Sequence, residues 1–284
     1  MVQYLHREHE LSIARSCEAM KLSRSTFYRP VTDWRVRDGQ VIDALNALVE
    51  RHFRWGFWTC FKYLRWKGSV WNHKKVHRVY CKMGLNQKRR GKKRVLNRER
   101  IPLEVSNQPN AQWAIDFMQD TLYTGRKFRT FNVIDEGMRE CLAIEVDTSL
   151  PSSRVVRTLN QLKEWRGLPR QIRLDNGPEF IAHALRDWAE EHKVKLAFIQ
   201  PGQPTQNAYI ERFNKTYREE VLNAHLFHSL DEVREITWWW MMDYNEERPH
   251  TATNNIPPTH YRLQIEQQLK TQKRQELSTL ELST

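Results

Sequence analysis

Three acidic residues have the types and contexts that metal-dependent phosphoryl chemistry uses. Asp116 interrupts an apolar strand, residues 113–117, where a buried carboxylate costs free energy unless a cation or hydrogen bonds compensate it. Asp175 ends a second apolar segment and precedes a tight Asn-Gly-Pro turn that exposes it at the strand end. Glu211 lies near the start of a helix, after a loop rich in Gly, Pro and Gln.

Carboxylate oxygens are the ligands that Mg²⁺ prefers, and the ion keeps several waters for a substrate. Two such ions, roughly 3.5–4 Å apart, can stabilise the attacking and the leaving oxygen of a phosphoryl transfer. Taken singly, each acid has an ordinary explanation, because a strand-end Asp is often a turn former and a helical Glu is usually solvated. Further acids stand near the same elements: Asp120, Asp135, Glu145, Asp147 and Glu179. Strand-edge solvation explains Asp120, and a supporting role for Glu179 stays open.

The spacing of the three acids and the motifs around them form a recognisable pattern. Between Asp116 and Asp175 lie 58 residues, and between Asp175 and Glu211 lie 35. The motifs are DNGPEF (175–180), PGQPTQNAYIERFN (201–214), YNEERPH (244–250) and LSRSTFY (22–28). Together they resemble the second-frame (OrfB) transposases of the insertion sequence three family, whose catalytic core is similar to that of retroviral integrases. The resemblance covers nearly the whole chain except the last twenty residues.

The resemblance implies both a fold and a reaction. The fold is α/β, an RNase H-like mixed sheet with flanking helices, preceded by an all-α helix-turn-helix DNA-binding region. The reaction is that of a DDE-type polynucleotidyl transferase, with Asp116, Asp175 and Glu211 holding two Mg²⁺ or Mn²⁺ ions. Water or a DNA 3′-hydroxyl would attack a phosphodiester in line, which gives strand cleavage and strand transfer of an insertion sequence through a circular intermediate.

Two basic residues follow Glu211 at helical spacing. Lys215 and Arg218 come four and seven residues later, so the three side chains share one helix face. The resemblance implies that both contact DNA near the reacting end. A salt bridge to Glu219 or another neighbour is the alternative, and Arg218 suits either.

Partners and rival functions follow from the same pattern. Joining two element ends on double-stranded DNA calls for at least two protomers, so we expect a homo-multimer. The family's first-frame (OrfA) product is not in this sequence, which leaves open whether the chain is complete or part of a frameshift fusion. A ribonuclease H-type nuclease usually adds a fourth carboxylate on the helix after the third strand, where this chain has only Glu164. A non-catalytic DNA-binding regulator is the other alternative, and the three intact acids argue against it.

Hydrophobic patterns predict the elements that must position the acids. They predict strands at 112–118, 127–135, 140–147, 171–174 and 194–199, and helices at 154–166, 181–192, 208–222 and 231–245. Three meandering strands followed by alternating helices and strands favour a mixed sheet flanked by helices.

Short helices are predicted before this core. Residues 11–20 and the segment after Ser23 favour a helix-turn-helix and an ordinary helical hairpin about equally, with Arg24 at the start of the recognition helix. Further helices are predicted at 38–53, after the break at 54–57 up to about residue 66, and at 72–83. On the last of these helices, Lys74, Lys75 and Arg78 favour a second DNA-binding unit. A helical bundle with a solvated basic face is the alternative.

The charge of the chain is concentrated in its first part. Residues 1–110 contain 24 Lys and Arg against 9 Asp and Glu, whereas the whole chain has a net charge of +12. A DNA-binding part followed by a carboxylate-using part explains this asymmetry. A basic run that we expect to track phosphates comprises Lys88, Arg89, Arg90, Lys92, Lys93 and Arg94.

The chain is therefore divided by prediction into five parts. They are a helix-turn-helix fragment (1–35), a helical DNA-binding domain (36–86), a basic linker (87–104), the catalytic core (105–264) and a C-terminal tail (265–284). The four cysteines show no disulfide or zinc framework, which fits a reducing compartment. No segment approaches eighteen consecutive apolar residues, so we expect no membrane span. The resemblance implies a bacterial cytoplasmic location, on the nucleoid when DNA is bound.

Overall fold

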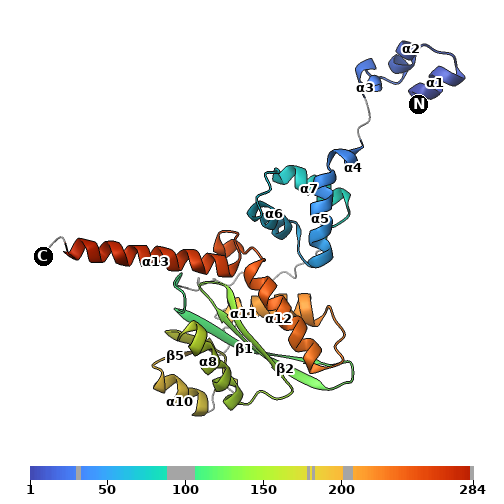
Figure 1. The fold of residues 1–284 in the computed structure, drawn as a ribbon. Helices are drawn as coiled ribbons and strands as arrows, with labels where there is room; N and C mark the ends of the chain where they lie inside the picture. The colour runs from blue at the N-terminus through green and yellow to red at the C-terminus, as the bar shows by residue number, and fades with distance from the viewer. Residues whose placement is uncertain (30–32, 88–105, 178–179, 181–182, 201–206, 282–284) are drawn as a thin grey trace.

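The computed structural model describes residues 1–29, 33–87, 106–177, 180, 183–200 and 207–281 (Figure 1). Within these residues, five strands form one sheet in the order β3-β2-β1-β4-β5. The strands are β1 (Gln112–Thr121), β2 (Lys127–Asp135), β3 (Glu140–Asp147), β4 (Gln171–Leu174) and β5 (Lys195–Phe198). β1, β2 and β3 pair antiparallel, whereas β4 and β5 run parallel to β1. The sheet is therefore mixed, as the sequence predicts.

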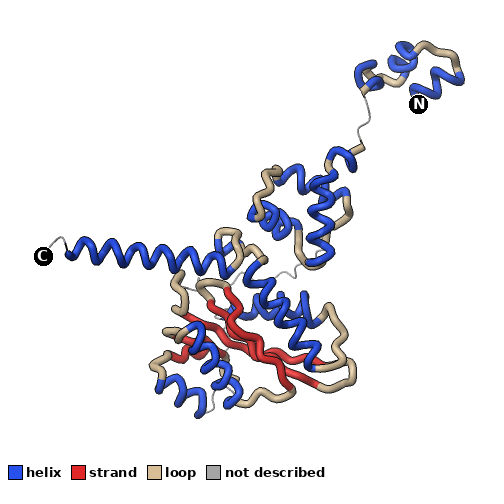
Figure 2. Tube along the Cα trace, viewed as in Figure 1, coloured by secondary structure: helices blue, strands red, loops and turns tan. Residues whose placement is uncertain are grey.

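Helices cover both faces of this sheet (Figure 2). They are α8 (Ser152–Arg166), α10 (His183–Glu191), α11 (Ala208–Tyr217), the π-helix η2 (Arg218–Leu222), α12 (Leu230–Glu246), the 3₁₀ turn η3 (Thr251–Thr253) and α13 (Pro258–Glu281). The order and the layers are those of the expected RNase H-like fold, with an all-helical region before it.

The alternation of side chains along β1 decides which layer each residue faces. Trp113 and Ile115 pack with residues of α8 and α10, whereas Ala114 and Met118 pack with residues of α11, η2 and α12. Because successive strand residues point to opposite faces, Asp116 lies on the side of Ala114 and Met118. It therefore faces the helix that carries Glu211.

From β1 onward, the predicted elements correspond closely to the observed ones, with two differences toward the C-terminus. The helix predicted at 208–222 changes at Arg218 from α-helical to π-helical geometry. Helix α13 was not predicted, and it runs across the boundary drawn at residue 264. Among its described side chains, those near the beginning anchor it, since Tyr261 is buried and Arg262 donates to Glu140, while residues 270–275 are exposed. A mostly polar sequence with so few buried positions has little helical periodicity to detect.

Among the described residues before β1, every regular element is a helix. These helices are α1 (Val2–Glu8), α2 (Ile13–Ala19), α3 (Arg24–Tyr28), α4 (Trp34–Arg37), α5 (Gly39–Arg51), α6 (Phe57–Trp66) and α7 (His73–Lys82). Ser12 and Ser23 cap α2 and α3 by accepting backbone N–H groups, the role expected for Ser23. Helices α5, α6 and α7 enclose their own apolar core, which includes Leu45, Trp55 and Val76. We call these three helices the helical unit.

The helical unit lies beside the C-terminal end of α12 and η3, while α1 to α3 lie at the far end of the molecule (Figure 1). Among the described residues, no helix combines the length and apolar character needed to cross a bilayer.

Candidate active site

Asp116 lies in the middle of β1 with its carboxylate fixed by two hydrogen bonds. One oxygen accepts the backbone N–H of Phe117 at 2.8 Å, and the other accepts the side-chain amide of Asn214 at 2.7 Å. The residue is half-buried. Its orientation is thus set by its own strand and by α11.

Asp175 follows β4 directly, at the end of a strand that runs parallel to β1. Ala114 pairs with Arg173, so Asp116 and Asp175 each follow the last paired position of these neighbouring strands by two residues. Neighbouring strands in a sheet lie about 4.8 Å apart, and residues in register point to the same face. The carboxylate of Asp175 accepts the backbone N–H of Gly177 at 2.9 Å, which holds the turn after the strand.

Glu211 lies in the first turn of α11, and its side chain is exposed. Asn214 follows three residues later, on the same helix face, and bonds Asp116. The Asn214 side chain also accepts the amide of the buried Asn132 of β2 at 2.7 Å. This amide pair joins α11 to two strands, and it turns the helix face of Glu211 toward Asp116.

Asn214 and Asn132 were not among the predicted site residues. The available signal for Asn214 is its place one helical turn after Glu211. No local signal distinguishes Asn132, since its part in the site depends on the pairing of β1 with β2.

The pKa of Asp116 reflects the charges of the other two acids. Burial and, to a smaller extent, the negative charges of Asp175 and Glu211 together raise the pKa of Asp116 to about 6, against the lowering effect of its hydrogen bonds. Among the described residues, no three His, Cys, Asp or Glu side chains converge closely enough to form a metal-ligand group. The donor chemistry still fits a divalent cation, because a cation would relieve the repulsion between these three carboxylates.

The two basic residues after Glu211 have different surroundings. Lys215 is exposed on α11. Arg218 donates to the carboxylate of Asp120 at 3.1 Å and to the carbonyl of Gln119 at 2.9 Å, so it ties η2 to the end of β1. The salt bridge anticipated as an alternative for Arg218 is present, with Asp120 as its partner rather than Glu219.

Other acids near the sheet serve the fold. Asp135 is fully buried and accepts backbone N–H groups from Gly137 and Met138 in the turn between β2 and β3. Glu145 and Asp147 both pair with Arg154 of α8. Each of these acids is neutralised within its own neighbourhood. Glu179 lies outside the described residues.

The predicted DNA-binding residues of the N-terminal helices differ in whether they are exposed or form ion pairs. Arg24 and Lys74 are exposed. Lys75 and Arg78 lie 3.7 and 2.9 Å from the buried carboxylate of Asp38, so both contribute to the fold of the helical unit. The basic run lies outside the described residues.

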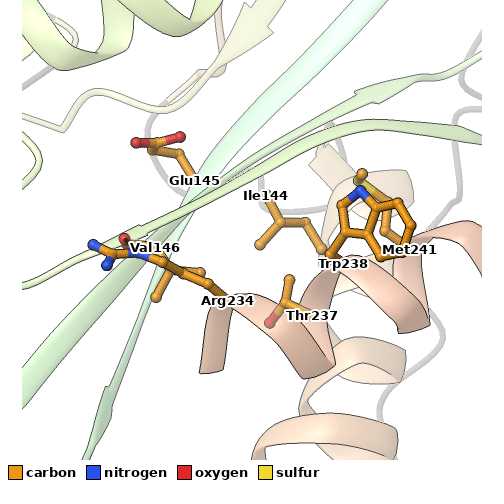
Figure 3. A pocket seen from close by; sticks show the side chains of 7 residues that line it. All are labelled: Ile144, Glu145, Val146, Arg234, Thr237, Trp238 and Met241. Atoms are coloured by element: carbon orange, nitrogen blue, oxygen red, sulfur yellow. Dashed lines mark hydrogen bonds between the residues drawn. The ribbon is translucent and has the colours of Figure 1, made fainter. Parts of the chain in front are cut away.

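A small cavity lies away from the three acids, between β3 and α12 (Figure 3). Its volume is about 150 Å³, and it is lined by Ile144, Glu145, Val146, Arg234, Thr237, Trp238 and Met241. None of the three acids lines it, so it has no part in the candidate active site.

Comparison with known proteins identifies the family to which this chain is similar. Two family models described as integrase core domain match residues 106–204 and 192–258. The 31.7 kDa protein of insertion element IS407 from Burkholderia multivorans is 38% identical over 253 residues, which cover 88% of this chain and 90% of that protein. The 39.2 kDa protein of IS476 from Xanthomonas euvesicatoria is also 38% identical, over 88% of this chain and 72% of that protein. Among solved structures, the magnesium complex of the HTLV-2 integrase catalytic core domain aligns with a TM-score of 0.45 and 17% identity, over 55% of this chain and 97% of that one.

Proposed function

Because this chain belongs to the insertion-element transposases, which are DDE-type polynucleotidyl transferases with an integrase core domain, we propose that it cleaves and joins DNA strands by a metal-dependent reaction. In this proposal Asp116, Asp175 and Glu211 hold two Mg²⁺ or Mn²⁺ ions. Water, and then a DNA 3′-hydroxyl, attacks a phosphodiester in line.

One observation carries the proposal above the others. Asp116 lies in β1 and Asp175 directly follows the adjacent strand β4, each two residues after the last paired position, and the charges of Asp175 and Glu211 both act on Asp116. Uncompensated acids in such proximity are unfavourable without a cation. When bound, two divalent ions neutralise the charge that develops on the attacking and leaving oxygens.

The residues around the acids support this role by holding them in place. Asn214 keeps one oxygen of Asp116 in a fixed direction, and Gly177 does the same for Asp175. Lys215 is exposed one turn after Glu211, and in this proposal it neutralises a backbone phosphate. Arg218 contacts DNA only if it leaves Asp120, so we assign it first to bracing η2 against β1.

The DNA partners follow from the distribution of charge. The N-terminal helices and the basic run would hold the element ends, with Arg24 and Lys74 exposed for contact. Joining two ends requires two protomers, so the active complex would be a multimer on double-stranded DNA. A first-frame product, as a partner or as a fused segment, would add to end recognition.

The test uses labelled element ends with Mg²⁺ or Mn²⁺. Asp175→Asn should lower strand cleavage and transfer by about a thousandfold or more while DNA binding persists, because the variant loses a metal ligand. Asp187→Asn, an exposed aspartate of α10, is the matched control and should behave as wild type.

Other outcomes would point to other functions. If wild-type protein binds the ends but never cleaves them with either metal, the chain is a DNA-binding regulator. If it cleaves only the RNA strand of a hybrid, it is a ribonuclease H-type nuclease. Equal activity in wild type and Asp175→Asn would show that Asp175 is not needed for the reaction.

A further inference from the structure

The YNEERPH motif (244–250) lies at the end of α12, away from the three acids. Its residues and their immediate neighbours contact the helical unit. We call residues 243–251 the brace. The contacts bridge parts of the chain about 190 positions apart, as in the Lys62 to Thr251 hydrogen bond at a separation of 189.

Polar pairs line the junction between the brace and the helical unit. Arg51 of α5 donates to Asp243 at 3.1 Å, and Lys67, after α6, lies 3.0 Å from Glu247. Lys62 donates to the hydroxyl of Thr251 at 2.7 Å. The basic partner in each pair belongs to the helical unit, so the junction is electrostatically complementary.

Arg248 lies at the centre of this junction. Its guanidinium lies 5.8 Å from the centre of the Trp55 ring, which is buried in the helical unit. On the other side it donates to both carboxylate oxygens of Glu220 at 2.5 and 2.6 Å. Arg248 and Glu220 are only 17% and 12% exposed, so removing either would leave the other as a poorly solvated charge.

Glu220 connects this junction to the catalytic helix. It lies in η2, which continues α11 without a break, and Glu211 is nine residues earlier on that helical tract. Glu220 also accepts the indole N–H of Trp240 at 2.9 Å. Contacts therefore run from Trp55 through Arg248 and Glu220 to the helix that carries Glu211.

A second contact fixes the brace to the sheet. The side chain of Asn245 accepts the backbone N–H of Cys141 and donates to its carbonyl, each at 2.8 Å. Cys141 belongs to β3, so α12 cannot shift along the sheet without breaking this pair. The brace thus has one side on the catalytic fold and the other on the helical unit.

We propose that the brace holds the helical unit in one fixed orientation on the catalytic core, so that DNA bound by the helices is presented at a set place relative to the three acids. In this role Asp243, Glu247 and Arg248 are positioning residues. They act through their contacts with Arg51, Lys67 and Trp55. The effect on reaction rate rests on the proposed function, whereas the effect on orientation does not.

A charge-reversal set tests the proposal. Asp243→Arg with Glu247→Lys places like charges across the junction, and adding Arg51→Glu with Lys67→Glu restores complementarity. Asp231→Arg with Glu235→Lys adds the same charge to exposed positions of the same helix and is the matched control. Far-ultraviolet circular dichroism checks that each variant is folded.

The first pair of substitutions should increase the radius of gyration in small-angle X-ray scattering. It should lower the strand-cleavage rate at saturating DNA about tenfold or more, because small misplacements of a substrate cost large factors in rate. Affinity for the element ends should change by less than about threefold. The four-residue variant should recover both the compact shape and the rate, and the control should match wild type.

Two results would overturn the proposal. An unchanged radius of gyration in the first variant means that the brace does not hold the helical unit. An expanded variant that cleaves at the wild-type rate means that fixed orientation is not needed. If wild type cleaves no DNA, the proposed function fails, and the scattering result alone still decides whether the brace exists. If the charge-reversed pair is unfolded, Arg51→Ala with Lys67→Ala removes the same contacts from exposed positions and should give the same expansion.

Discussion

Asp116 accepts hydrogen bonds from two donors and lies near two other acids. The donors and the acids have opposite effects on its pKa. The amide of Asn214 and the N–H of Phe117 favour the charged form, whereas burial and the charges of Asp175 and Glu211 disfavour it. The balance leaves its pKa at about 6, above the ordinary value of 3.8. In the absence of metal, this carboxylate therefore destabilises the folded protein at neutral pH.

The pH range of this effect follows from the two pKa values. Below about pH 4 the side chain is protonated in both folded and unfolded states, so it contributes no penalty. As the pH rises toward 6, the unfolded chain releases the proton first, and the penalty grows until it is complete above pH 6. A bound cation removes it, because the cation favours the charged form.

Asp116→Asn should therefore stabilise the metal-free protein at pH 8 by about 1–2 kcal/mol. Raising the pKa from 3.8 to about 6 corresponds to about 3 kcal/mol, and the imperfect fit of an amide to the Asn214 donor costs about 1 kcal/mol. The gain should vanish at pH 4, and Mg²⁺ should raise the melting temperature of wild type more than that of the variant. Thermal unfolding with EDTA or Mg²⁺ across this range measures it. An equal gain at pH 4 and pH 8 would contradict the electrostatic origin.

At the scale of elements, the turn between β2 and β3 is built around Asp135. The buried carboxylate accepts the N–H groups of Gly137 and Met138, at 3.0 and 3.1 Å, and that of Asn110 at 2.9 Å. A side chain at Gly137 would place its Cβ 2.3 Å from the carbonyl oxygen of Ser106. The segment that enters the core thus passes directly over this turn, and only glycine leaves room for it.

Gly137→Ala should destabilise the core by about 1–3 kcal/mol, since backbone must shift to admit the methyl group. Gly39→Ala is the control, because its Cβ would meet nothing within 4 Å and alanine favours the helix that begins there. Urea unfolding of both variants gives the comparison. Equal stability of the two variants would mean that the backbone at Ser106 shifts without a loss of folding free energy.

Positive and negative charges are distributed unevenly along the chain. Net positive charge is confined to the first 110 residues, and the acids of the candidate site lie in the remainder. Phosphate binding by the first part would therefore bring DNA to a core whose own charge is slightly negative.

Neutralising Lys92, Lys93 and Arg94 to Gln should weaken DNA binding and flatten its salt dependence. Each lost phosphate contact lowers the slope of log K against log salt by about 0.9. Neutralising Lys270, Lys273 and Arg274, exposed residues of α13, removes the same charge at another place and should leave the slope near that of wild type. Fluorescence anisotropy titrations at several salt concentrations measure both. Equal slopes in the two variants would mean that the basic run affects DNA binding only through the net charge of the protein.

The strands, most helices and the three acids follow from local pattern. Strand periodicity over a few residues identified β2, β3 and β4 with their observed bounds, and motif spacing singled out Asp116, Asp175 and Glu211. These features depend on neighbours along the chain, so a single sequence contains them. Helix α13 was not predicted, because few of its described residues are buried.

Tertiary structure decided the rest. The placement of Asp116 beside Asp175 depends on β4 pairing with β1 rather than with β3, which precedes it in sequence. The Asn214 contact to Asp116 joins positions 98 apart, and the Arg51 contact to Asp243 joins positions 192 apart. Such contacts form only when every intervening element is packed, because a small shift of α11 or α12 separates the partners. The sequence alone therefore determined which acids are candidates, whereas packing decided their neighbours and joined the YNEERPH motif to the helical unit.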